Sequence, residues 1–350
     1  MSSVLVSPQL TPSMTRGKGV WAAAAARFKT DRVGLTSLVI VAAFLLVVLA
    51  SGLGLVAKDW QVERGVPDAP PTFIGPAAKT ESVAVAAPSG PNVDISAVDP
   101  LAPRYAEWAE AAKKYQTKDA VRADTLPFGG DRLGRDVLAK AIKGAQVSIL
   151  VGVSAALLAT LIGTLLGAVA GFFGGKAGDL LEWVYNVFTA IPSILLIFAF
   201  AAVFGRGIGS VVLILGLAGW TGIYRLVRAE FIKHANRDYV RSAEAIGASN
   251  ASRMFRHILP NVSHVVLVQL SIHVVSFIKS EVILSYLGLG VGVDQVSWGT
   301  MLSEAQSELI LGHWWQLAAA TIFMAVFVTA FSLMTDALRD ALDPKLRGLE

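Results

Sequence analysis

The chain has 350 residues, of which 54% are apolar and only 16% charged, and its mean hydropathy is +0.58. A typical soluble domain is about 25% charged, so this balance predicts an all-α polytopic membrane protein. The net charge of +4 and the pI near 9.3 would suit nucleic-acid binding, but the basic residues flank apolar runs, which is the pattern that orients membrane proteins. The absence of cysteine excludes a disulfide framework, thiol catalysis and thiolate metal sites.

Residues 1–32 are predicted to be a cytoplasmic tail that ends in a short Ala-rich surface helix. Residues 33–56 form the first apolar run, which is long enough to cross a bilayer. A cleaved signal peptide is the alternative, because Ala50, Ser51 and Gly52 are small; the run exceeds the usual apolar region of about 7–15 residues, which favours a retained span. The basic residues ahead of this span place the N-terminus in the cytoplasm; they are Arg16, Lys18, Arg27, Lys29 and Arg32.

Residues 57–146 are predicted to be a long extracytoplasmic loop in which basic and acidic residues balance one for one. Loops longer than about 60 residues are exported despite their lysines. Residues 77–100 have the composition of a linker. Two helices are expected from apolar spacing: an amphipathic helix carrying Tyr105, Trp108, Ala112 and Tyr115, and a second one on the outer surface carrying Leu133, Val137, Ala141 and Ala145.

Five further apolar runs complete a transmembrane core over residues 147–334, and a polar cytoplasmic tail follows at 335–350. The expected spans are 147–170, 184–204 with Pro192 near its middle, 208–226, 262–287 and 317–334. Six transmembrane helices with the N-terminus inside place the charged segment 229–261 in the cytoplasm, where its basic residues outnumber its acidic ones. The chain is therefore expected to be a multi-pass protein of a bacterial inner membrane.

The stretch YVRSAEAIGASNASRMFRHILPN, residues 239–261, is predicted to be a cytoplasmic helical hairpin. A first helix suits 239–246, and Gly247 can take the positive φ that ends a helix. Ser249 or Asn250 can cap a second helix, and Pro260 is expected to end it because proline has no N–H. A polar hairpin on a membrane protein needs a docking partner, and we interpret it as the part that receives force.

This hairpin resembles the EAA loop in permease subunits of ATP-binding cassette (ABC) importers, whose pattern is E-A-A, three residues, G, nine residues, I, one residue, L-P. Aligned on the glycine, Arg241 stands where the family has its acidic residue, and Glu244 lies one turn further on as a candidate substitute. The resemblance implies an ATPase-coupling site formed by Tyr239, Arg241, Ala243, Glu244, Gly247, Ala248, Leu259 and Pro260.

Three further stretches are similar to C-type subunits of dipeptide and oligopeptide permeases. They are residues 129–152, LSYLGLG at 284–290 followed by SWGTML at 297–302, and DALRDALDPKLR at 336–347. The resemblance covers about 129–347 and the first span, while the loop at 57–126 is longer than is usual in the family. It implies import of di- or oligopeptides from a periplasmic binding protein, through this chain and a homologous second permease. A nickel importer of the same family is the close alternative; a secondary transporter and a membrane-embedded enzyme are alternatives of other classes.

The chain has no G-x-x-x-x-G-K-[ST] phosphate loop. We therefore expect this chain to bind no cofactor, and two separate ATPase subunits to hold ATP and Mg. The histidines show no metal-ligand spacing, no catalytic set is recognisable, and no nucleic-acid partner is expected. Besides those subunits, the lipid bilayer is the expected partner.

Ionisable residues inside a predicted span face a bundle interior or an aqueous cavity, because exposure to lipid is costly. His273 and Glu281 in the fifth span are therefore candidates for the substrate pathway, Glu281 toward a peptide amino terminus; snorkelling to the outer surface is the alternative. Lys279 is two residues from Glu281, so the two do not face each other on a regular helix. Outside the spans, Asp131, Arg135 and Asp136 are candidates for contact with the binding protein or for an outer gate, and a solvated helix face is the alternative.

Gly163, Gly167 and Gly171 repeat at four-residue intervals on the second span. Such a stripe allows close helix approach. Packing within the chain is favoured over an interface with the second permease.

Overall fold

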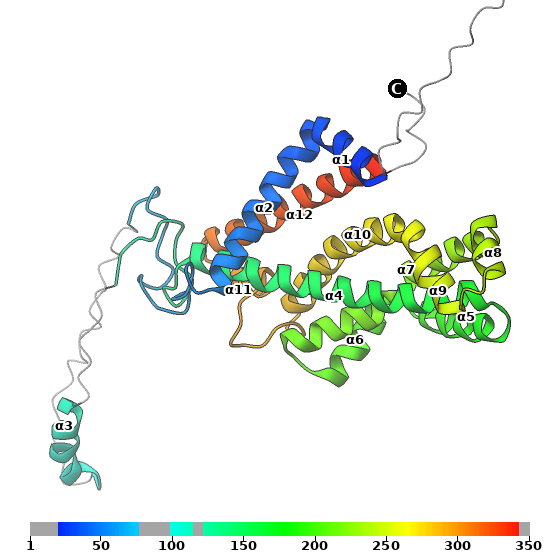
Figure 1. Cartoon of the computed structure of the whole chain (residues 1–350). Helices are drawn as coiled ribbons and strands as arrows, with labels where there is room; N and C mark the ends of the chain where they lie inside the picture. The colour runs from blue at the N-terminus through cyan, green and yellow to red at the C-terminus, as the bar shows by residue number, and fades with distance from the viewer. Residues whose placement is uncertain (1–19, 77–98, 115–121, 343–350) are drawn as a thin grey trace, which may run out of the picture.

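The computed structural model describes residues 20–76, 99–114 and 122–342 (Figure 1). Residues 1–19 of the predicted N-terminal tail, most of the predicted linker, Tyr115 and the end of the C-terminal tail lie outside these residues. The helices are α1 (Val20–Thr30), α2 (Arg32–Gly52), α3 (Tyr105–Lys114), α4 (Val137–Phe173), α5 (Gly175–Ala190), α6 (Ser193–Phe204), α7 (Ile208–Ala235), α8 (Asp238–Ala245), α9 (Asn250–Ser252), α10 (Leu259–Tyr286), α11 (Trp298–Ile310) and α12 (Trp315–Leu342), with a 3-10 turn at Ala102–Arg104 and a π-helical stretch at Arg253–Ile258.

Five helical segments of the described chain are long and apolar enough to cross a membrane: α2, α4, α7, the continuous helix Asn250–Tyr286 that contains α10, and α12. The bent pair α5 and α6 raises the number to six if it is counted as one span. The fold class predicted from the sequence, an all-α polytopic membrane protein, is confirmed.

The helices run back and forth, so their ends gather at two ends of the bundle (Figure 1). We call one the hairpin end, where α8, α9 and α5 lie, and the other the loop end, which comprises residues 57–76 and 122–136 together with α11. At the loop end, single β-bridges tie the two loop stretches together, among them Glu63 with Arg135 and Pro71 with Leu126.

α4 differs from the sequence prediction at its start. The separate surface helix expected around Leu133–Ala145 does not exist, because its residues from Val137 onward form the first turns of α4. The Asp136 side chain caps α4 by accepting from the Leu138 N–H at 2.8 Å, and Ala141 and Ala145 are fully buried. The four-residue apolar spacing was therefore the buried face of a 37-residue helix.

The span expected at 184–204 is also different, because α5 and α6 meet at an angle of 91°. Ile191 is extended, with ψ of 131°, and Pro192 precedes the first residue of α6. A residue before proline is forced out of the helical region, which explains the position of the break. The expected kink is thus a right-angled elbow between two helices.

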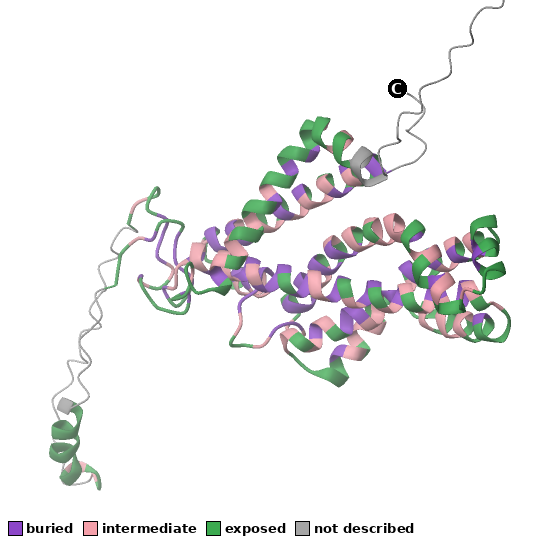
Figure 2. Cartoon of the chain, viewed as in Figure 1, coloured by how far each residue is buried: buried purple, intermediate pink, exposed green. Residues whose placement is uncertain are grey.

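The glycine stripe of α4 packs inside the chain, against α7. A Cβ at Gly163 would lie 2.1 Å from Ile223 Cγ2, and one at Gly167 would lie 2.7 Å from the Tyr224 carbonyl oxygen. Burial follows this contact, since α4 is largely buried where it meets its neighbours (Figure 2). The preference for internal packing is confirmed.

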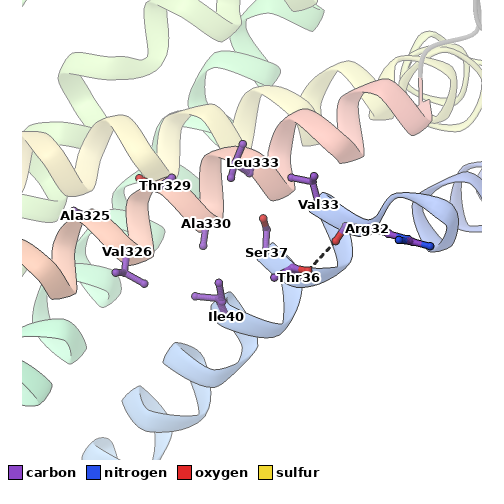
Figure 3. A pocket seen from close by; sticks show the side chains of 10 residues that line it. All are labelled: Arg32, Val33, Thr36, Ser37, Ile40, Ala325, Val326, Thr329, Ala330 and Leu333. Atoms are coloured by element: carbon purple, nitrogen blue, oxygen red, sulfur yellow. Dashed lines mark hydrogen bonds between the residues drawn. The ribbon is translucent and has the colours of Figure 1, made fainter.

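α2 and α12 pair side by side, and α12 continues to Leu342, eight residues past the end predicted for the sixth span. A groove of about 610 Å³ lies between them (Figure 3). Its lining is apolar apart from hydroxyls and Arg32, whose side chain extends away from the groove. This surface suits the acyl chains that surround membrane-spanning helices.

Candidate functional site

The hairpin at residues 238–258 turns at a glycine with a positive φ. α8 ends at Ala245, the Ala248 N–H donates to the Ala243 carbonyl at 3.0 Å, and Gly247 has φ of +89°. A left-handed residue of this kind is the usual end of a helix. Apart from its two chain neighbours, no heavy atom of the described residues lies within 4 Å of a Cβ built on Gly247, so the turn needs glycine for its backbone and leaves open space around it. The Ser249 side chain then caps α9 by accepting from the Ser252 N–H at 3.3 Å.

One face of the hairpin is anchored to the bundle. Val240 is 2% exposed, and it packs in one apolar cluster with Met254 and Ile258 from the second half of the hairpin and Phe231 from α7. Ala243 is also buried. The opposite face and the tip are open: Tyr239, Arg241, Glu244 and Gly247 are exposed, and Ile246 is 86% exposed.

Pro260 does not end the second helix, contrary to the sequence prediction. The residues before it form a π-helical stretch, in which the Leu259 N–H bonds the Met254 carbonyl, and α10 continues without a break to Tyr286. A wider turn accommodates the proline ring and its missing N–H. The second half of the hairpin and the membrane-spanning α10 are therefore one helix of 37 residues.

An ion pair ties the two halves of the hairpin together. The Glu244 carboxylate lies 2.7 Å from the Arg253 guanidinium, which also sits over the Phe172 ring at the end of α4 with 5.2 Å to the centroid. The Tyr239 hydroxyl lies 2.8 Å from His234 Nδ1 at the end of α7. Arg241 is exposed on α8, Ala248 and Leu259 are half-buried and Pro260 is exposed. The eight predicted coupling residues thus share one end of the bundle.

The two predicted pathway residues are buried within the chain. His273 is 8% exposed and stacks on Phe277, with 5.2 Å between the ring centres. Glu281 is fully buried and accepts from the Ser285 hydroxyl at 2.6 Å, where α10 meets α4 and α11. Lys279 is exposed on α10, which agrees with the prediction that it does not face Glu281.

The three predicted outer-face residues all take part in building the loop end. The fully buried Asp131 carboxylate accepts from Lys140 Nζ at 2.7 Å and from Arg135 Nε at 2.7 Å. Burial acts to raise the pKa of Asp131, but the charges and hydrogen bonds of Lys140 and Arg135 outweigh it and lower the pKa below its ordinary value. Asp136 caps α4.

The sequence analysis missed the residues that complete this cluster. Lys140, in the first turn of α4, is fully buried, and besides Asp131 its ammonium group contacts Glu304 Oε2 at 2.5 Å and Gln316 Oε1 at 3.0 Å. We call Asp131, Arg135, Lys140, Glu304 and Gln316 the loop-end cluster. All three donors of the lysine are satisfied. Glu304 and Gln316 are more than 160 residues away from Lys140 in sequence, so no local signal could reveal that these side chains meet.

Glu308 on α11 adjoins this cluster and titrates near neutrality. It is 2% exposed, and this burial is the largest cause of a rise in its pKa to about 7. The hydrogen bond from the Arg132 N–H and the charge of Lys140 act to lower the pKa, whereas the charges of Asp131 and Asp68 act to raise it. A pKa above the ordinary 4.5 means that the folded state binds the proton more tightly than the unfolded chain. Its stabilising contribution is therefore full below about pH 4.5 and is lost as the pH rises to about 7.

Glu308→Gln is consequently expected to raise the free energy of unfolding at pH 8, by on the order of 2 kcal/mol, and to leave it unchanged at pH 4.5. The amide keeps the acceptor for Arg132. The measurement is the thermal unfolding of the purified full chain in detergent across this pH range. Glu107→Gln on the exposed α3 is the control. An equal pH slope in wild type and Glu308→Gln would contradict the assignment.

No group of three or more His, Cys, Asp or Glu side chains that could hold a metal ion exists within residues 20–76, 99–114 and 122–342. The chain offers a hairpin with an exposed tip, a long helix that starts in that hairpin, and a fixed ionic assembly at the other end of the bundle.

Comparison with known proteins gives consistent matches over the core of the chain. Residues 163–348, more than half of the chain, match the family described as binding-protein-dependent transport system inner membrane component. The oligopeptide transport system permease protein OppC of Bacillus subtilis (strain 168) is 36% identical over 238 residues, which cover 67% of this chain and 78% of that protein.

Two further relatives point the same way. The di/tripeptide transport system permease protein DppC of Pseudomonas aeruginosa (strain UCBPP-PA14) is 38% identical over 63% of this chain and 73% of its own length. The glutathione transport system permease protein GsiD of Escherichia coli O6:K15:H31 has the same identity and coverage. Among solved structures, the methionine ABC transporter in an inward-facing conformation matches 58% of this chain and 96% of its own at a TM-score of 0.49 and 13% identity, too weak a likeness to carry an argument.

These relatives are permease proteins and not ATP-hydrolysing enzymes, and the same holds for this chain. Its apolar helices are those of a multi-pass inner-membrane protein. The chain belongs to the binding-protein-dependent transport system inner membrane components, within the dipeptide and oligopeptide permeases of ABC importers.

Proposed function

We propose that this chain forms, with a homologous second permease, the pathway through which di- or oligopeptides cross the inner membrane. A periplasmic binding protein delivers the peptide at the loop end. Two ATPase subunits, which hold ATP and Mg, act at the hairpin end through the segment 229–261. Under this proposal residues 1–32 and 335–350 are cytoplasmic, and residues 33–56 form the first span. Residues 57–146, up to the membrane-spanning part of α4, are extracytoplasmic, and residues 147–334 form the transmembrane core.

One observation carries the proposal: the second half of the hairpin and α10 are a single helix, Asn250–Tyr286. At about 1.5 Å per residue, that helix extends from the exposed tip to the opposite end of the bundle. The Glu244–Arg253 pair and the cluster of Val240, Met254 and Ile258 fix α8 to it. Movement of a partner bound at the tip is therefore transmitted directly to α10.

The proposal is tested by Gly247→Trp in the complex assembled with its binding protein, second permease and ATPase subunits. A bulky side chain at the tip is expected to lower ATP-dependent peptide uptake at least tenfold, because it blocks close approach of the ATPase subunit. Gly312→Trp is the matched control, since Gly312 has φ of +91°, equally open surroundings and a place at the loop end.

Both variants are first checked for membrane insertion, and ATPase-subunit binding is measured by co-purification. Loss of that binding in Gly247→Trp but not in Gly312→Trp is the expected result, and normal uptake by Gly247→Trp would refute the coupling role. Uptake of nickel instead of peptide by the wild-type complex would support the alternative substrate. Membership of the ABC importer family decides against a secondary transporter.

A further inference from the structure

A cavity lies between α10 and α12, on the face of α10 opposite to Glu281. Figure 1 shows α2 and α12 as a pair set apart from α4, α7 and α10 at the hairpin end. The cavity has a volume of about 380 Å³, within the range of small-molecule sites. Its polar lining is Ser271, Ser276 and Lys279 from α10 and Ser332, Thr335 and Asp336 from α12.

A second cavity of about 470 Å³ adjoins the first on its hairpin-end side, and Ile272 lines both. It is bounded by α7, α10 and α12 and includes Gln269 and Arg339. The second cavity is lined mainly by apolar side chains, whereas the hydroxyl groups lie in the first.

The charges in the first cavity are inconsistent with a surface that faces lipid. Lys279 and Asp336 are both exposed in this chain and both belong to helices that are long and apolar enough to cross the membrane, Asp336 two residues beyond the core that ends at 334. A charged side chain turned toward lipid is costly, so such residues face water, a partner or a polar ligand. Glu281, which the sequence offered as a candidate for substrate contact, is by contrast enclosed by protein.

One hydroxyl of the cavity has its proton already engaged. Ser271 Oγ donates to the Leu267 carbonyl at 3.0 Å, so toward a ligand this hydroxyl can act only as an acceptor. Like the Asp336 carboxylate it suits an ammonium group, whereas the Lys279 ammonium suits a carboxylate.

We propose that this cavity recognises the two charged ends of a short peptide, the carboxyl terminus through Lys279 and the amino terminus through Asp336 with Ser271. The inference rests on the proposed peptide import and names the chemistry that the pathway selects. One cation and one carboxylate in the same cavity match a zwitterion, and they match a bare metal ion or a neutral solute poorly. Contact with both ends favours free peptides over terminally blocked ones.

The test is uptake into proteoliposomes that contain the complete complex, with Lys279→Gln and Asp336→Asn variants. Each variant is compared with wild type on the same tripeptide in three forms: unmodified, C-terminally amidated and N-acetylated. For each peptide form, the uptake rate of the variant is divided by that of the wild type, so the preference of the binding protein for one form cancels. Lys176→Gln on α5 and Asp340→Asn, one turn beyond Asp336 on α12, are controls, because both residues are exposed and lie outside the cavity.

Lys279→Gln is expected to lower uptake of the unmodified and N-acetylated peptides about tenfold, as for loss of one charged hydrogen bond, and to leave the amidated peptide at the wild-type rate. Asp336→Asn is expected to lower uptake of the unmodified and amidated peptides and to leave uptake of the N-acetylated peptide at the wild-type rate. Equal effects on all three peptides, no effect, or poor recovery of the assembled complex would overturn the inference, the last because the charges would then hold subunits together.

A second measurement covers the case in which blocked peptides are not delivered at a measurable rate. Tripeptides with a photoreactive group at the carboxyl or the amino end are expected to label α10 and α12 respectively, and labelling elsewhere overturns the inference. Failure of the proposed function is a different result: the wild-type complex would then take up no peptide in an ATP-dependent manner.

Discussion

Lys140→Met is expected to destabilise the folded chain by about 3 kcal/mol, because it removes a buried cation from the buried Asp131 carboxylate and the half-buried Glu304 carboxylate. Lys140 is fully buried, and its ammonium group contacts Asp131, Glu304 and Gln316. Methionine has a similar length but satisfies none of these acceptors. Arg135 still reaches Asp131 at 2.6 Å, which keeps the loss below that of a wholly unpaired charge.

The effect is measured as the thermal unfolding of the purified full chain in detergent. Lys143→Met is the control, since Lys143 lies on the same helix, half-buried, with a hydrogen bond to Gln146 at 2.8 Å; a change of about 0.5 kcal/mol is expected there. Protease cleavage within residues 122–136 should accelerate only in Lys140→Met. Equal losses in both variants would show that the loop-end cluster is not the cause.

The second large effect is expected from Gly163→Ala, which should lower stability by about 2 kcal/mol through overpacking between α4 and α7. The added Cβ would meet Ile223 Cγ2 at 2.1 Å and the Trp220 carbonyl oxygen at 2.5 Å. The first neighbour is a side chain that can move, but the second is backbone. The clash of the added Cβ is therefore relieved only if α4 and α7 move apart.

The matched control is the same substitution at Gly209 in the first turns of α7, where no heavy atom lies within 4 Å of the added Cβ. Alanine is preferred over glycine in a helix by roughly 0.5–1 kcal/mol, so Gly209→Ala is expected to be neutral or stabilising. Thermal unfolding in detergent measures both. A Gly163→Ala variant as stable as Gly209→Ala would contradict the close α4–α7 packing.

The sequence predicted the fold class well because the bilayer imposes a simple requirement on each span. Long apolar runs give α2, α4, α7, α10 and α12, and the turn after α8 follows ordinary capping chemistry at Gly247. What it did not predict depends on tertiary structure. The angle at Pro192 and the π-helical stretch before Pro260 are two different accommodations of the same residue type, decided by neighbours.

α11 was missed for a related reason. Its residues include Glu304, Gln306 and Glu308, so the stretch resembles a polar loop. A local signal was present, however, because Ser297 and Thr300 form a capping box at its start. The candidate site shows the same division: the hairpin was visible in local sequence, whereas the α10–α12 cavity and the loop-end cluster arise from residues far apart in the chain.

The elbow at Pro192 has a consequence for the lipid beside it. α6 has 12 residues and rises about 18 Å, whereas the hydrocarbon layer is about 30 Å thick. α5 turns away at 91° and exposes Leu180 and Trp183, the residue types that settle at the level of the headgroups. We therefore expect the bilayer to be locally thin along this flank, beside the short α6.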